Sequence, residues 1–139
     1  MTIDLVNVIK QNYEQVVDRI HRAAEGKGRD PESIRLLVVT KGHSLEVARA
    51  AVSAGAQYLG ENYVEEAVSK IQALIGEAVE WHMIGHVQSR KARPVCEYFA
   101  WVHSIDRLII ARYLNDFVGQ VNRHLPVLLE CNVSGDASK

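Results

Sequence analysis

Apolar and polar residues along the chain follow two patterns, one typical of amphipathic helices and one typical of buried strands. Apolar positions recur at helical spacing through residues 3–25, which predicts a long amphipathic helix. Gly26 and Gly28 end this pattern, and the Asp30-Pro31 pair that follows is typical of a turn. The next segment, residues 36–40, carries a run of apolar side chains and predicts a strand that is buried on both faces.

The alternation of helix and strand continues to the end of the chain. Further strands are expected at residues 57–60, 80–85, 100–103 and 126–132. The helices between them are expected over residues 44–55 with Ser44 as N-cap, over residues 62–76, from residue 88 with Pro94 in the first turn or at a kink, and over residues 105–123. Strands separated by helices in this way are typical of parallel strands joined by right-handed crossovers. The predicted fold class is therefore α/β.

Two closures of such a sheet remain open on this pattern, an open doubly wound sheet and a (β/α)₈ barrel. Five strands cannot close a barrel of eight, and the sequence ends in a polar loop shortly after the fifth predicted strand. We therefore interpret residues 1–139 as one domain that is cut short. The open edge of its fifth strand would invite pairing with another copy or with a separate C-terminal piece.

The composition adds few constraints on function. The 139 residues are 47% apolar and 24% charged, which is typical of a soluble globular domain. The net charge is −1, no apolar run is long enough to span a membrane, and the first residues lack the plan of a signal peptide. We therefore expect no nucleic-acid partner, no membrane association and a cytoplasmic location. Cys96 and Cys131 lie far apart in the sequence and predict reduced thiols without a metal site.

Polar or ionisable side chains follow the carboxyl ends of the predicted strands, where ligands bind in either closure. Lys41 follows the first strand, Asn62 the second and Ser104 the fourth, while His82 lies in the third and Lys139 in the loop after the fifth. A lysine at the mouth of a buried sheet would lose solvation, which lowers its pKa and makes its amine more nucleophilic. Such an amine is suited to form a Schiff base with an aldehyde.

Each of these residues also has a purely structural interpretation. Lys41 can simply end a strand and point into solvent, and Asn62 and Ser104 can be helix N-caps. His82 can be a hydrogen-bonded core histidine. Glu61 can hold Lys41 or a neighbouring backbone N–H through a charge-assisted hydrogen bond, or it can be a solvated loop carboxylate.

Several blocks of the sequence occur in the order and spacing of one protein family. They are the strand that ends at Lys41, Gly60-Glu61-Asn62-Tyr63, Trp81-His82-Met83-Ile84-Gly85, Gln88-Ser89-Arg90-Lys91, His103-Ser104-Ile105-Asp106-Arg107 and residues 132–139. On these blocks the chain resembles the pyridoxal phosphate homeostasis protein family, and the resemblance extends over nearly all of the chain. That family is related to the N-terminal domain of alanine racemases.

The resemblance implies a (β/α)₈ barrel that binds pyridoxal 5'-phosphate at the carboxyl ends of its strands. The cofactor would be held as an internal aldimine on Lys41. Asn62 matches a family residue next to the cofactor, and His82 and Ser104 match residues on strand ends that face the site. Lys139 matches a late lysine in the loop after strand five, so it joins the expected cofactor-binding residues.

This sequence departs from the family pattern in two ways. Gly42 and Arg90 replace the usual Thr and Asn, and neither change removes the Lys41 amine. The larger departure is length, because the family continues through strands six to eight. Those strands supply the phosphate cradle and the arginine that faces the pyridine nitrogen. We therefore predict that the 139-residue chain by itself binds the cofactor poorly or not at all.

The family implies a carrier without catalytic turnover of its own. It would keep the free aldehyde low and exchange the cofactor with pyridoxal-phosphate-dependent apoenzymes, and the full-length protein would be a monomer. A second interpretation is a pyridoxal-phosphate-dependent amino-acid racemase, which needs two bases on opposite faces of the substrate carbon. A third is an incomplete fragment that assembles with a second chain.

Overall fold

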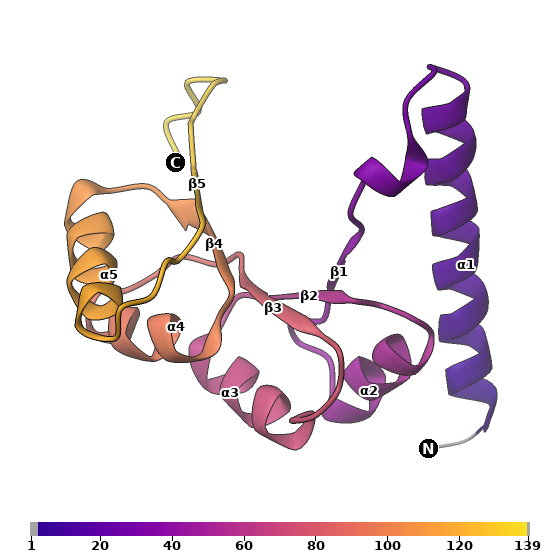
Figure 1. Ribbon diagram of the computed structural model, residues 1–139, viewed down its shortest axis with the longest axis horizontal. Helices are drawn as coiled ribbons and strands as arrows, with labels where there is room; N and C mark the ends of the chain where they lie inside the picture. The colour runs from indigo at the N-terminus through magenta and orange to yellow at the C-terminus, as the bar shows by residue number, and fades with distance from the viewer. Residues whose placement is uncertain (1–2, 139) are drawn as a thin grey trace.

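The computed structural model describes residues 3–138 of the chain. Helices and strands alternate along these residues, and the helices pack against a parallel sheet (Figure 1). In chain order the elements are α1 (Ile3–Glu25), η1 (Pro31–Ser33), β1 (Leu37–Val39), α2 (Leu45–Ser53), β2 (Tyr58–Glu61), α3 (Val64–Ala73), β3 (Glu80–Met83), η2 (Ser89–Lys91), α4 (Ala92–Tyr98), β4 (Trp101–Ile105), α5 (Leu108–Gln120) and β5 (Val127–Leu129). The predicted α/β class is confirmed.

The strands of the sheet follow one another in chain order. Within residues 3–138 the order is β1-β2-β3-β4-β5, and every neighbouring pair is parallel. Figure 1 shows the sheet curving into an arc, with α2, α3, α4 and α5 along its outer side and α1 beside β1. A doubly wound sheet reverses its strand order at a switch point, and this sheet does not. The fold is therefore that of successive βα units of the (β/α)₈-barrel type, preceded by an N-terminal helix.

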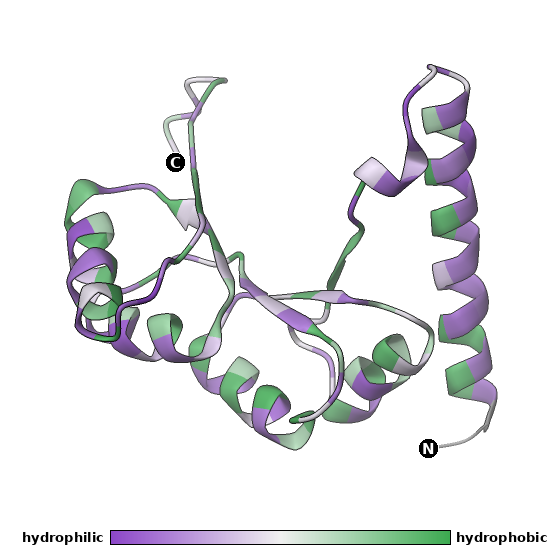
Figure 2. Ribbon diagram, in the orientation of Figure 1, coloured by the Kyte–Doolittle hydropathy of each residue, from purple (hydrophilic) through white to green (hydrophobic). Residues whose placement is uncertain are grey.

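The main core lies between the sheet and the outer helices. Alternate residues of a strand point to opposite faces, and Leu59, Met83 and Val102 all point toward the helices and are fully buried. The helices contribute many of the other core members, among them Ala48, Ala67, Val95 and Ile110, and Phe99 joins them directly after α4. Figure 2 shows hydrophobic and hydrophilic residues alternating along the helices, as amphipathic helices require. Each helix thus turns one apolar side to the sheet.

Local signals at the helix ends agree with the sequence. The first helix spans Ile3–Glu25, the same residues that the periodicity predicts. The Ser44 side chain accepts a hydrogen bond from the Val47 backbone N–H at 3.5 Å, which makes it the N-cap of α2. Pro94 is the third residue of α4, in the first turn, where its missing N–H costs no hydrogen bond.

The two edge strands of the sheet are less buried than the sequence predicts. The expectation that residues 36–40 are buried on both faces is wrong, because among the described residues β1 pairs on one side only, and Val39 is 44% exposed. The fifth strand is shorter than the expected 126–132, and its last residue, Leu129, is 72% exposed. An apolar run shows that a strand can be buried, but the number of its neighbours decides whether it is.

Three further expectations concern partners and thiols. Within residues 3–138, no helix combines the length and apolar character that are needed to cross a membrane. That same part of the chain holds no group of three or more His, Cys, Asp or Glu side chains that could bind a metal ion. Cys96 is buried, Cys131 is exposed, and both are free thiols.

Candidate functional site at the carboxyl ends of the strands

Lys41 lies in the turn after β1, two residues beyond the last strand residue, Val39. Its side chain is exposed, and within residues 3–138 no carboxylate or other hydrogen-bonding group engages its ammonium. The next residue, Gly42, has a φ of +72°, a left-handed conformation that glycine adopts without strain. Because β1 is an edge strand, the described residues do not desolvate the Lys41 amine as the sequence suggests.

Behind Lys41, a buried polar network joins the end of β1 to the end of β2. Glu61 is 0% exposed, and its Oε1 accepts from the Thr40 hydroxyl at 2.6 Å and from Lys70 Nζ at 2.8 Å. Both sequence interpretations of Glu61 are therefore wrong, since it neither holds Lys41 nor lies in solvent. Lys70 is not among the residues predicted from the sequence, although its position four residues after Glu66 on a helix was a usable signal.

Gly85, in the loop after β3, brings Asn62 and Ser104 together. The Asn62 backbone lies so close that a Cβ on Gly85 would be 2.6 Å from the Asn62 Cα. From the other side, the buried Ser104 hydroxyl donates to the Gly85 carbonyl at 2.5 Å. The N-cap interpretations of Asn62 and Ser104 are both wrong, because Tyr63 and Arg107 occupy the cap positions of α3 and α5. The two residues instead fix the relative positions of three strand ends.

A pocket of about 420 Å³ opens beside this contact. Its lining includes Asn62, Gly85, His86 and Lys91. Lys91 forms an ion pair with Glu65, which also lines the pocket. The pocket therefore lies on the side of Asn62 that faces the β3–α4 loop, and Lys41 is not among its lining residues.

His82 lies on the face of the sheet opposite the helices and is buried. Its Nδ1 is 2.8 Å from His103 Nε2, its Nε2 is 3.0 Å from Glu80 Oε1, and its ring stacks on Trp101. Burial lowers the pKa of His82, although the hydrogen bond to Glu80 opposes this, and burial also lowers the pKa of His103. The core interpretation of His82 is confirmed. Within residues 3–138 no hydrogen bond joins it to Lys41 or Asn62.

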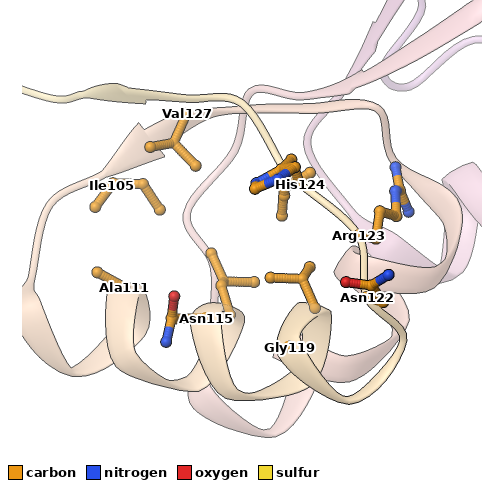
Figure 3. Close-up of a pocket in the computed structure, with 11 residues that line it drawn as sticks. Ile105, Ala111, Asn115, Gly119, Asn122, Arg123, His124 and Val127 are labelled. Carbon is orange, nitrogen blue, oxygen red and sulfur yellow. The ribbon is translucent and has the colours of Figure 1, made fainter.

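A second pocket, of about 400 Å³, lies between α5 and the strands β4 and β5 (Figure 3). Asn115, Arg123 and His124 line it together with apolar residues. Lys41, Asn62, His82 and Ser104 are not among the lining residues, so this pocket is separate from the strand-end site. The remaining predicted site residue, Lys139, lies outside the described residues.

The protein is of the (β/α)₈-barrel class, because its parallel strands follow one another in chain order with helices on the outside. The exposed Lys41 places an amine at the carboxyl edge of this sheet. The family model for the alanine racemase N-terminal domain matches residues 6–136, and the chain belongs to that family.

Curated relatives and solved structures agree with this membership. Relatives from Pseudomonas aeruginosa and Escherichia coli K12, both named pyridoxal phosphate homeostasis protein, are 43% and 45% identical over 134 and 137 residues. The matches cover 96% of this chain but only 58% of each relative. PipY of Synechococcus elongatus, solved with pyridoxal phosphate bound, is 34% identical with a TM-score of 0.72, covering 85% of this chain and 56% of PipY. A solved protein from Bifidobacterium adolescentis is 28% identical to this chain, with a TM-score of 0.87. The match covers 100% of this chain and 60% of the Bifidobacterium protein.

Proposed function

We propose that this chain is the lysine-bearing part of a pyridoxal phosphate homeostasis protein, which holds the cofactor reversibly on Lys41 without turning over a substrate. The observation that carries the proposal is the state of Lys41. It lies at the carboxyl edge of the sheet, it is exposed, and within residues 3–138 no acidic group neutralises it. The relatives that are named for this function and PipY with its bound cofactor support the same assignment.

The residues present fit the aldehyde end of the cofactor. Pyridoxal phosphate supplies a carbonyl that condenses reversibly with a primary amine. Lys41 provides that amine and, in its neutral form, its lone pair, while its exposure lets a free aldehyde reach it from solvent. Asn62 and Ser104 hold the neighbouring strand ends in place through Gly85. We assign no described residue to the phosphate, so we expect this chain by itself to have low affinity.

Reductive trapping tests the proposal. The purified chain is mixed with pyridoxal phosphate, reduced with borohydride and mapped by peptide mass spectrometry. We expect the label at Lys41 to form faster than at Lys10 and Lys27, which are also exposed. Lys41→Ala should lose this fast label, whereas Lys10→Ala should keep it. Equal labelling of Lys41 and Lys10 in the unmodified chain contradicts the proposal.

Partners and location are part of the same proposal. An exposed amine that binds the cofactor reversibly can release it to pyridoxal-phosphate-dependent apoenzymes in the cytoplasm. The exposed side chains of Val127, Leu128 and Leu129 on the β5 edge support association of this chain with a second copy. Sedimentation velocity at increasing concentration tests the association, and a sedimentation coefficient that stays at the monomer value contradicts it.

A further inference from the structure

The Lys70 ammonium is the centre of the buried network behind Lys41. It is 4% exposed, and Nζ donates to the Thr40 carbonyl at 2.8 Å, to Glu61 Oε1 at 2.8 Å and to Glu66 Oε1 at 2.7 Å. An ammonium group has three N–H donors, so each one has an acceptor. Burial opposes the charge on Lys70, but the hydrogen bonds that Lys70 donates to Glu61 and Glu66 outweigh burial and raise the Lys70 pKa above its ordinary value.

The network holds the peptide groups on either side of the Lys41 Cα. The Thr40 carbonyl belongs to the peptide bond that precedes Lys41, and Lys70 donates to it directly. The Gly42 N–H belongs to the peptide bond that follows Lys41, and it donates to Glu66 Oε1 at 2.8 Å. The same Glu66 oxygen accepts from Lys70. The His43 N–H also donates to the Thr40 carbonyl at 3.1 Å and closes the turn. The buried ammonium thus contacts one peptide plane beside Lys41 directly and the other through Glu66, and these two planes set the direction of the Lys41 side chain.

We propose that Lys70 is a positioning residue for Lys41, which aims the exposed amine at the carboxyl edge of the sheet without touching its ligand. The inference rests on the proposed function, because it concerns how the same amine meets an aldehyde. Lys41 itself lies in a turn after an edge strand, and among residues 3–138 no ladder hydrogen bond holds Lys41 or Gly42. Small displacements of a reacting group cost large factors in rate, so a turn that carries a nucleophile needs such support.

A merely structural ion pair is the alternative to this role. Buried ion pairs often contribute little net stability, because the cost of desolvating both charges offsets their attraction. This one also leaves Glu61 Oε2 buried without a hydrogen-bond partner among residues 3–138, which is a further cost. If Lys70 only fastened α3 to the sheet, its loss would lower stability and leave the relative reactivity of Lys41 unchanged.

Two variants of the full chain distinguish these roles. Lys70→Met keeps the length of the side chain and removes the ammonium. Glu66→Ala removes the oxygen that accepts from both the Gly42 N–H and Lys70 Nζ but leaves the Lys70 ammonium with Glu61 and the Thr40 carbonyl. Because the Glu66 side chain is 30% exposed, the fold should tolerate this change if Lys70→Met does not fold. Lys10→Met, at an exposed position of α1, is the matched control.

The readout is the ratio of borohydride-fixed pyridoxal phosphate at Lys41 to that at exposed Lys27 in the same sample. In Lys70→Met and in Glu66→Ala we expect this ratio to fall about tenfold, with faster hydrogen exchange at the Gly42 amide. Lys10→Met should change neither the labelling ratio nor the hydrogen exchange of the Gly42 amide. An unchanged ratio in the folded variants overturns the positioning role alone. A wild-type chain without preference for Lys41 overturns the proposed function, and this inference with it.

Discussion

The backbone of Asn62 packs directly against Gly85, with no room between them for a side chain. The Gly85 carbonyl, in turn, accepts the hydrogen bond of the Ser104 hydroxyl. Three successive strand ends, those of β2, β3 and β4, therefore meet at one glycine. This contact explains why a glycine follows β3, and it holds together two of the residues that the sequence predicts at the site.

Gly85→Ala should lower the free energy of unfolding by about 3 kcal/mol, because the new methyl group would collide with backbone that cannot rotate away. The nearest atom would be the Asn62 carbonyl oxygen, followed by the Asn62 Cα at 2.6 Å and its carbonyl carbon at 2.8 Å. Gly119→Ala is the matched control, since a Cβ on Gly119 meets nothing within 4 Å and α5 favours alanine. Urea denaturation of both variants measures the difference. A loss below about 1 kcal/mol for Gly85→Ala would show that the contact relaxes easily.

The His82–His103 pair should make stability depend on pH near neutrality. Burial lowers the pKa of both imidazoles below the ordinary value of 6.5. The unfolded chain therefore takes up protons before the folded chain does, and protonation favours unfolding. The stabilising contribution is complete above pH 6.5 and is lost as the pH falls toward the folded-state pKa values. The carboxylate of Glu80 faces His82 and partly offsets the lowering of its pKa, while the positive charge of Arg35 lowers this pKa further.

Measurement of the free energy of unfolding between about pH 7 and pH 5 tests this dependence. His103→Gln should flatten the slope in this window, whereas His124→Gln, at an exposed position, should leave it unchanged. Glu66 has a lowered pKa because of its hydrogen bond to Lys70, so its contribution is lost only below its ordinary value of 4.5, outside the window. An equal slope in His103→Gln and wild type would contradict the prediction.

The two cysteines should differ strongly in reactivity. Burial raises the pKa of the Cys96 thiol to about 11, and its Sγ also contacts the Leu114 carbonyl at 3.6 Å. Cys131 is exposed beyond β5. At about pH 8, iodoacetamide should therefore modify Cys131 and spare Cys96 until the chain is unfolded. Peptide mapping identifies the site, and Cys131→Ser should abolish the fast reaction. Rapid modification of Cys96 in the folded protein would refute the assignment.

Arg123 should contribute about 2 kcal/mol to the free energy of unfolding, because it donates hydrogen bonds to carbonyl groups at the end of α4. Its guanidinium donates to the Phe99 carbonyl at 2.6 Å and also to the Cys96 carbonyl. Arg123→Met would keep much of the side-chain packing and leave both carbonyls without their donor. Thermal and urea denaturation measure the loss, and Arg112→Met on the exposed side of α5 is the control. Equal stability of the two variants would show that water replaces the guanidinium.

Local patterns in the sequence were sufficient for the order and type of the elements. The bounds of α1, the Ser44 cap and the place of Pro94 depend on residues within one or two turns of each other, and all three agree with the structure. The position of Lys41 just after the first strand follows in the same way from the neighbouring apolar run.

Burial and side-chain partners, in contrast, were decided only by the tertiary structure. The apolar runs at β1 and β5 resemble those of interior strands, yet both strands lie at the edges because nothing within residues 3–138 pairs with their outer sides. From the sequence, Glu61 could be a solvated loop carboxylate. In the structure it is buried, because α3 places Lys70, nine residues further along the chain, against it. The sequence determined which residues stand at the strand ends. Folding decided which of them touch, since hydrogen bonds and packing between distant segments depend on distances that no local pattern encodes.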